Sequence, residues 1–165
     1  MAFFRKVFNE VADLSENSAI EAEHTYVDAI MIHLLQRPDT FDVMVLENMY
    51  GDIVSDLTAT LTGGMGFAAS ADIGDDHAMF QCAGGSAPDI AGQDKANPAA
   101  QILSGAMMLD WLGKRHAVPE ARRAATILDK AVDSVLADGH LTSDAGGVTR
   151  SSEFGDLVAS AVYNL

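Results

Sequence analysis

An apolar run at residues 41–46 ("FDVMVL") passes within a few residues into a helical pattern at residues 52–62, and this succession constrains the fold more than any other part of the sequence. The run is short, apolar and bounded by polar residues, which is typical of a buried strand. The helical pattern ends at the glycine pair Gly63 and Gly64, a common helix terminus. A strand that leads directly into a helix is the repeating unit of α/β domains, so the sequence predicts that class.

Further helices and strands are predicted on both sides of this unit. Apolar residues recur at helical spacing in five other segments, and Asp28 is the predicted N-cap of one of these helices. Three short segments have the composition of strands. The predicted helices cover residues 3–14, 28–37, 98–112, 119–137 and 151–162, and the predicted strands lie near residues 20–27, 66–71 and 78–83.

The charge balance limits the classes of partner. Asp and Glu number 24 against 10 Lys and Arg, which gives a formal charge of −14. Such a surface repels phosphate backbones, so we expect no nucleic-acid partner. No apolar run approaches the roughly 20 residues that span a bilayer, so we expect no membrane partner. The single cysteine, Cys82, and an N-terminus without a secretory signal favour a cytoplasmic location.

Two aspartates in the helix at residues 52–62 form a candidate metal site. Asp52 and Asp56 are spaced i, i+4, so their carboxylates lie on one helix face, and hard cations such as Mg²⁺ or Mn²⁺ prefer carboxylate oxygens. An acid in a first helical turn also complements the helix dipole without binding a metal, and Asp56 could simply face solvent. The five histidines form no i, i+4 pair, which argues against zinc.

A stretch of 15 residues at 84–98 ("GGSAPDIAGQDKANP") shows no periodicity. Loops of this length inside compact domains are usually functional or disordered, and this one is not of low complexity. We therefore expect a functional loop. By contrast, Gly63, Gly64 and Gly66 are interpreted as a simple turn after a helix.

Read in order, "YVDA", "FDVMVLENMYGDIVSD", "GGSAPDIAG", "KANPAAQILSGAMML" and "SEFGD" resemble the metal-dependent β-decarboxylating 2-hydroxyacid dehydrogenases, which include isocitrate, isopropylmalate and tartrate dehydrogenases. The resemblance implies an NAD-linked oxidation of a malate-like substrate followed by loss of its β-carboxylate. It also implies an isopropylmalate-dehydrogenase-like α/β fold with helices flanking a mixed sheet. Residues 1–62 would be part of the substrate and dimerisation domain, and residues 63–165 the C-terminal part of the cofactor domain.

The same resemblance implies roles for the acids of the first part. Asp52 and Asp56 match metal ligands of one subunit, and Asp28 matches the acid that reaches across the dimer interface to a neighbouring site. A divalent cation held there would orient the substrate and stabilise the enolate left after decarboxylation. Asn48 matches a contact to the nicotinamide end of the cofactor.

The loop at residues 84–98 resembles the family's adenosine-binding loop. A carboxylate at Asp89 accepts hydrogen bonds from free ribose hydroxyls and repels a 2′-phosphate, which favours NAD over NADP. Asn97 would read the adenine edge, and Asp144 matches a second cofactor-side loop. The cofactor-binding residues implied by the resemblance are Asn48, Gly85, Ser86, Ala87, Asp89, Ile90, Asn97 and Asp144.

Several features depart from the family's pattern. Gly84 replaces a usual histidine and Gln81 a common glutamate, so we expect NAD binding to be weak or lost. Family chains are much longer, and no counterpart is found here for the catalytic lysine, the catalytic tyrosine or the arginines that bind the substrate carboxylates. We therefore expect an incomplete, C-terminal half of the fold, with no catalytic residue except Asp28 as the cross-subunit acid.

Three interpretations follow. The first is a half-enzyme, inactive alone and completed by a separate N-terminal-half chain. The second is a non-catalytic nucleotide-binding or regulatory subunit. The third is a vestigial structural oligomer. In each, an incomplete sheet leaves strand edges and apolar helix faces exposed, so we expect a homodimer or a larger oligomer.

Overall fold

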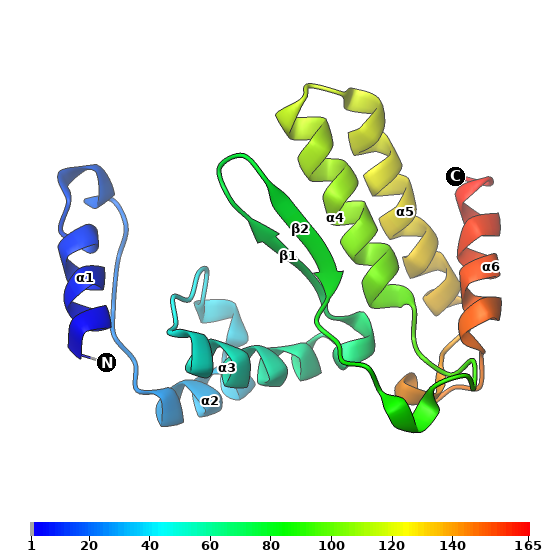
Figure 1. The fold of residues 1–165 in the computed structure, drawn as a ribbon, viewed down its shortest axis with the longest axis horizontal. Coiled ribbons are helices and arrows are strands. Elements are labelled where there is room, and N and C mark those ends of the chain that lie inside the picture. Colours follow the sequence, from blue (N-terminus) through cyan, green and yellow to red (C-terminus); the bar gives the residue numbers. More distant parts are fainter. Residues whose placement is uncertain (1) are drawn as a thin grey trace. The chain divides into compact units, whose positions relative to one another are not determined.

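The computed structural model describes residues 2–165, which form two compact units, Met1–Thr58 and Ala59–Leu165. Figure 1 shows the elements in chain order. They are helices α1 (Ala2–Ala12), α2 (Val27–Gln36) and α3 (Asn48–Leu61), strands β1 (Ala69–Ile73) and β2 (Ala78–Cys82), and helices α4 (Ala99–Arg115), α5 (Pro119–Ala137) and α6 (Ser151–Val162). The α/β class predicted from the sequence is confirmed.

The core of the first unit lies between α2 and α3. Ile30 and Leu34, one turn apart on α2, are buried against Val54 of α3. This i, i+4 spacing places both α2 side chains on one face, which is why the helix packs through that face. Partly buried residues complete the cluster; they are Met31, Phe41, Met44, Leu46 and Leu57.

Two strands predicted in the first unit are absent from it. Residues 20–27 and 41–46 form no ladder with any described strand. Phe41, Met44 and Leu46 are nevertheless packed against the α2–α3 core. The buried strand predicted at residues 41–46 is therefore wrong: the segment forms no ladder, and Val43 and Val45 are 84% and 60% exposed. Apolar composition was not enough to form a strand here, because a strand also needs a paired neighbour.

The helix boundaries in this unit also differ from those predicted. Helix α3 begins at Asn48, four residues before the predicted start at Asp52. The Glu47 carboxylate accepts the Met49 backbone N–H at 3.2 Å, which satisfies one first-turn amide. Asp28 is not an N-cap: Tyr26 occupies that position, and Asp28 lies in the first turn with its Oδ1 accepting the Ala29 N–H at 2.9 Å.

The second unit contains an antiparallel hairpin and three helices. Strands β1 and β2 pair from Ala69 opposite Cys82 to Ile73 opposite Ala78. In the part of the chain that the structure describes, this two-stranded ribbon is the whole sheet, so the expected mixed sheet is not formed there. Two side chains of α4 tie the helix to the ribbon. The buried Ser104 hydroxyl accepts the Ser70 N–H at 3.2 Å, and Gln101 accepts the Cys82 N–H at 3.3 Å.

Helices α4, α5 and α6 share one apolar core. Phe154 of α6 is fully buried among α4 and α5 side chains, and Figure 1 shows the three helices side by side. The buried members of the cluster are Ala99, Ala131, Val132, Val135, Phe154 and Val158. Apart from Phe154, the buried members are alanines and valines, whose small side chains fill the space around the ring. No helix of residues 2–165 is long and apolar enough to cross a membrane.

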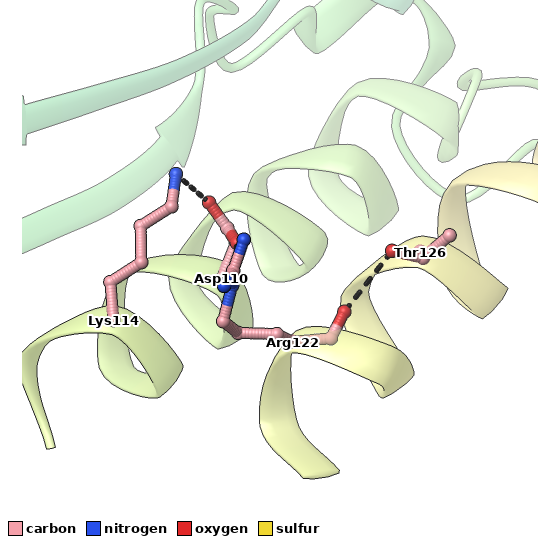
Figure 2. Close-up of polar contacts among 4 residues, drawn as sticks. All are labelled: Asp110, Lys114, Arg122 and Thr126. Atoms are coloured by element: carbon pink, nitrogen blue, oxygen red, sulfur yellow. Dashed lines mark hydrogen bonds and ion pairs between the residues drawn. The ribbon is translucent and has the colours of Figure 1, made fainter. Parts of the chain in front are cut away.

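A charged cluster on the surface joins α4 to α5. The Asp110 carboxylate of α4 lies 2.5 Å from Lys114 Nζ and 3.3 Å from Nε of Arg122 on α5. Figure 2 shows these side chains gathered between the two helices. The hydrogen bond from Lys114, with a smaller contribution from Arg122, holds the pKa of Asp110 below its usual value. Beside this cluster the helices nearly touch: a Cβ on the buried Gly113 would lie 2.5 Å from Arg122 Cγ. Arg122 therefore serves helix packing.

Candidate metal and cofactor site

The acid pair on α3 lies on the helix face opposite the core. Asp52 and Asp56 are both exposed, whereas Val54 between them is 1% exposed and packs against α2. The 3.6-residue repeat explains this division, because residues 52 and 56 lie about 200° around the helix from residue 54. The structure thus presents two carboxylates one turn apart on an open face.

A third acid is needed to complete the predicted site. Asp28 on α2 is exposed, and among residues 2–165 no group of three or more His, Cys, Asp or Glu side chains is arranged to hold a metal ion. The resemblance assigned Asp28 to the site of a sister protomer, so one chain alone is expected to show only the pair. The assignment of Asp28, Asp52 and Asp56 as metal ligands stays a prediction.

The loop at residues 84–98 has local order of its own. Pro88–Ile90 forms one turn of 3₁₀ helix, and the Gln93 side-chain amide donates to the Asp89 carbonyl at 2.7 Å. Ala87, with φ of 40°, turns the chain through a left-handed conformation just before that helix.

The predicted cofactor residues of this loop are accessible. Gly85, Ser86, Ala87 and Asp89 are exposed, and Ile90 is half-buried. A Cβ on Gly85 would meet nothing within 4 Å, so the backbone there borders open space. Within the described chain the Asp89 carboxylate accepts no hydrogen bond, which leaves its oxygens available to hydroxyl donors.

Asn97 and Asp144 come together from distant parts of the sequence. The Asn97 side-chain amide donates to Asp144 Oδ2 at 3.1 Å, and Asn97 Oδ1 accepts the Ala99 N–H at the start of α4 at 2.9 Å. The other Asp144 oxygen accepts the hydroxyl of the buried Thr142 at 2.5 Å. Asn97 keeps one N–H free of these contacts. The two residues predicted for the adenine side thus form one polar bridge.

Gly66 makes this bridge possible. A Cβ on Gly66 would lie 2.2 Å from Asp144 Oδ2 and 2.7 Å from Asn97 Cβ. Only a residue without a side chain fits there. The sequence interpretation treated Gly66 as a simple turn residue and so missed its role. The only indication in the sequence was that Gly66 is a third glycine, although Gly63 and Gly64 already suffice to end the helix.

Asp94 is a second residue that sequence reasoning missed. It lies in the loop with φ of 56°, and its carboxylate accepts the backbone N–H of Ser152 at 2.9 Å and the Ser152 hydroxyl at 2.6 Å. The hydroxyl and the backbone N–H of Ser152 lower the pKa of Asp94, with a small contribution from Arg150 and a small opposing effect of burial. Ser152 is 58 residues away in the sequence, so no local pattern predicts its contact with Asp94.

The predicted site residues fall into two groups by unit. Asp28, Asn48, Asp52 and Asp56 belong to Met1–Thr58, whereas the loop residues and Asp144 belong to Ala59–Leu165. The first offers hard oxygen ligands, and the second offers exposed backbone, a free carboxylate and an amide N–H. Carboxylate oxygens are the ligands that hard divalent cations prefer, and a few polar groups beside accessible backbone are typical of small-molecule sites.

Known proteins resemble this chain over most of its length. The family model described as isocitrate/isopropylmalate dehydrogenase matches residues 1–158. The chain is 44% identical over 159 residues to the 3-isopropylmalate/3-methylmalate dehydrogenase of Methanocaldococcus jannaschii, covering 96% of this chain and 45% of that protein. It is 47% identical over 146 residues to the isocitrate/homoisocitrate dehydrogenase of Thermus thermophilus, covering 88% and 42%. It is 40% identical to the probable tartrate dehydrogenase/decarboxylase of Bacillus subtilis, covering 100% and 45%.

A solved structure gives the same result. The isocitrate dehydrogenase of Methylococcus capsulatus superposes with a TM-score of 0.84 at 38% identity, covering 98% of this chain and 46% of that one. The chain therefore spans less than half the length of the relatives it matches, and its resemblance to them extends over almost all of its own residues. The chain thus belongs to the isocitrate/isopropylmalate dehydrogenase family.

Proposed function

We propose that this chain supplies part of an NAD-dependent, Mg²⁺- or Mn²⁺-dependent dehydrogenase that oxidatively decarboxylates a malate-like 2-hydroxyacid. Its contributions would be the metal-binding acids and the loop at residues 84–98, called the nucleotide loop below. The observation that carries the proposal is the Asn97–Asp144 bridge in the second unit. Two residues assigned to the adenosine side by resemblance alone are hydrogen-bonded across 47 residues of sequence. A chance resemblance of short motifs gives no reason for that meeting.

The nucleotide loop fits the cofactor chemically. The exposed Asp89 carboxylate accepts hydrogen bonds from the two ribose hydroxyls, and its charge opposes a 2′-phosphate. The remaining Asn97 N–H donates to an acceptor nitrogen of adenine. Main-chain groups of Gly85 and Ser86 approach the nucleotide closely because neither position carries a bulky side chain.

The acids of α3 fit a hard divalent cation. Asp52 and Asp56 bind it from one helix face, and Asp28 of a sister protomer adds the third carboxylate. When bound, the cation would supply Lewis-acid stabilisation of charge on the substrate oxygens, and the nicotinamide would supply the hydride acceptor. In this proposal the proton-transfer groups and the arginines that bind the substrate come from residues outside 1–165. We therefore expect residues 1–165 alone to show no turnover.

A homodimer or larger oligomer follows from the same proposal. The first unit exposes large apolar side chains on α2, on α3 and in the segment between them, among them Ile32, Leu35, Val43, Val45 and Ile53. Apolar surface on this scale favours association. A molecular mass of one chain by light scattering at micromolar concentration would contradict this part of the proposal.

Calorimetric titration tests the binding functions directly. We expect Mn²⁺ to bind to wild type and not to the variant Asp52→Asn/Asp56→Asn, while both bind NAD. Co-expression with the N-terminal half of the Methanocaldococcus relative then tests catalysis, by NADH formation on isopropylmalate, isocitrate and tartrate. No NAD binding at millimolar concentration would overturn the cofactor assignment.

A second candidate, a non-catalytic nucleotide-binding or regulatory subunit, is favoured by one feature. Gly84 stands where the family usually has histidine, and Gln81 stands where many members have glutamate. Gly84 begins the loop at residues 84–98, Gln81 lies in β2, and both are exposed. Weak NAD binding without any activity after co-expression supports this candidate over the half-enzyme.

A further inference from the structure

Asp94 lies near the exit of the nucleotide loop and is connected to the N-terminus of α6. Its backbone carbonyl accepts the Ser151 N–H at 3.0 Å, and its carboxylate accepts the Ser152 N–H at 2.9 Å and hydroxyl at 2.6 Å. These amides are the first two of the helix, which have no partner inside it. Arg150, the N-cap residue of α6, gives no side-chain cap. Asp94 thus caps α6 from a distant part of the chain.

The partner of Asp94 is a fixed point of the second unit. Helix α6 is anchored by Phe154 and Val158, which are 0% and 3% exposed in the core shared with α4 and α5. The Ser151 hydroxyl also donates to the Ala96 carbonyl, so the loop is attached to α6 on both sides of Lys95. Asn97 follows Ala96 in the sequence, so these two attachments fix the position of the Asn97 backbone.

The backbone at Asp94 suits this role. Its φ of 56° is in the left-handed region, which Asp, Asn and Gly adopt more readily than other residues. That turn directs the carboxylate and the carbonyl of one residue toward two successive amides of α6. Charge assists, because a carboxylate at a helix N-terminus is stabilised by the helix dipole.

We propose that Asp94 is a positioning residue that holds the exit of the nucleotide loop on the N-terminus of α6 and thereby pre-organises Asn97 for NAD. The proposal rests on the nucleotide-binding function proposed above. A loop that is already in its binding conformation spends less binding free energy on becoming ordered, so its affinity is higher. The lowered pKa of Asp94 is consistent with a carboxylate that stays ionised in this contact.

Four variants separate the side-chain contact from its alternatives. Asp94→Gly keeps the left-handed turn and the backbone bond to Ser151 but removes both side-chain contacts. Asp94→Asn keeps an acceptor for the Ser152 N–H and tolerates the same φ. Ser152→Ala removes only the hydroxyl contact and serves if Asp94→Gly fails to fold. Glu153→Gln is the matched control, since Glu153 is an exposed acid in the same helical turn with no hydrogen bond to the loop within the described residues.

Two measurements on the whole chain decide the outcome: amide hydrogen exchange without nucleotide, and the Kd for NAD by calorimetry. We expect Asp94→Gly to raise exchange at residues 95–97 and 151–153 but not in α5, and to raise the Kd about five- to tenfold. Asp94→Asn should restore most of the affinity, Ser152→Ala should show a smaller increase in both quantities, and Glu153→Gln should match wild type.

The results distinguish this proposal from the function on which it rests. No NAD binding by wild type overturns the proposed function and, with it, the positioning role. Wild-type binding that Asp94→Gly leaves unchanged overturns the positioning role alone. Unchanged exchange at residues 95–97 in Asp94→Gly overturns the attachment itself, whether or not NAD binds. An increase in Kd for Glu153→Gln equal to that for Asp94→Gly would show that only charge at the helix end matters, and would also overturn the proposal.

Discussion

The amide of Asn97 donates a hydrogen bond to the carboxylate of Asp144 across 3.1 Å, and this contact joins the end of the nucleotide loop to the turn that precedes α6. Each residue has a second anchor: Asn97 caps the start of α4 through the Ala99 N–H, and Asp144 accepts the hydroxyl of the buried Thr142. The bridge therefore couples two loops through fixed elements. Asn97 retains one amide N–H outside these contacts.

Replacing Gly66 tests the bridge. In Gly66→Ala the new Cβ would lie 2.2 Å from Asp144 Oδ2, so the bridge must open or the strand entry must shift. We expect a loss of about 1–3 kcal/mol in the free energy of unfolding, together with weaker NAD binding. Urea denaturation followed by the fluorescence of Trp111, the single tryptophan, measures the first effect.

Gly105→Ala is the control for that substitution. Gly105 lies inside α4, and a Cβ there would meet nothing within 4 Å. Alanine is the better helix former, so this variant should be unchanged or more stable by up to about 1 kcal/mol. Equal stability of the Gly66→Ala and Gly105→Ala variants would contradict the close packing of Gly66 against the bridge.

Asp89 should decide between the two nicotinamide cofactors. We expect wild type to bind NAD at least about tenfold more tightly than NADP, because a carboxylate repels the 2′-phosphate. Asp89→Asn removes the charge and should reduce the preference for NAD over NADP, mainly because NADP binds more tightly. Stability should not change, since within the described chain the carboxylate makes no hydrogen bond. Calorimetry with both cofactors gives the ratio; similar affinities of wild type for NAD and NADP would argue against the role.

Substitutions in the acid pair on α3 should weaken metal binding without changing the stability of the fold. We expect Asp52→Asn and Asp56→Asn each to weaken Mn²⁺ binding severalfold, because each removes one charged ligand. Both acids are exposed, so stability without metal should change by less than about 0.5 kcal/mol. Asp42→Asn, at an exposed acid of the same unit with no predicted role, is the control. An equal loss of Mn²⁺ affinity in that variant would indicate nonspecific attraction to an acidic surface.

Periodicity predicted the long helices of the second unit well. The predicted bounds 119–137 and 151–162 coincide with α5 and α6, because proline or serine starts and apolar repeats act locally. The strands at 20–27 and 41–46 were wrong for the opposite reason. Strand formation depends on a pairing partner that local sequence does not reveal, and Phe41 and Leu46 are packed without one.

Spacing alone singled out Asp52 and Asp56, whereas the cofactor-side residues were named only from the family pattern. Asn97 and Asp144 were named from that resemblance, and the structure shows that they meet. Gly66 and Asp94 were missed, because their roles depend on contacts with residues far along the sequence. Physical reasoning from one sequence identifies side chains with suitable chemistry, but it does not identify the residues that hold them in place.

Phe154 is expected to dominate the stability of the second unit. It is fully buried where α4, α5 and α6 meet, so Phe154→Ala should lower the free energy of unfolding by about 3–5 kcal/mol. Phe154→Leu fills much of the same space and should lose clearly less. Chemical denaturation compares the two variants. A cost below about 1 kcal/mol for Phe154→Ala would contradict the packing described here.

Replacing Asp129 on α5 should raise stability, whereas replacing Phe154 lowers it, and the size of this gain should depend on pH. Partial burial raises the pKa of Asp129 above its ordinary value of 3.8, and the nearby charges of Asp133 and Asp110 raise it further. Because the folded-state pKa is the higher one, folding favours the protonated acid. The ionised form therefore weakens the fold progressively as pH rises from the unfolded-state pKa through the folded-state pKa.

Asp129→Asn removes that ionisation. At pH 7 we expect the variant to be more stable than wild type by up to about 0.5 kcal/mol, since the site is largely exposed and solvent screens the repulsion. The difference should shrink as pH falls and vanish well below pH 3.8. Asp133→Asn relieves only the repulsion, so its gain should be smaller. A stability difference that persists unchanged from pH 7 to pH 3 would show that ionisation of Asp129 is not its cause.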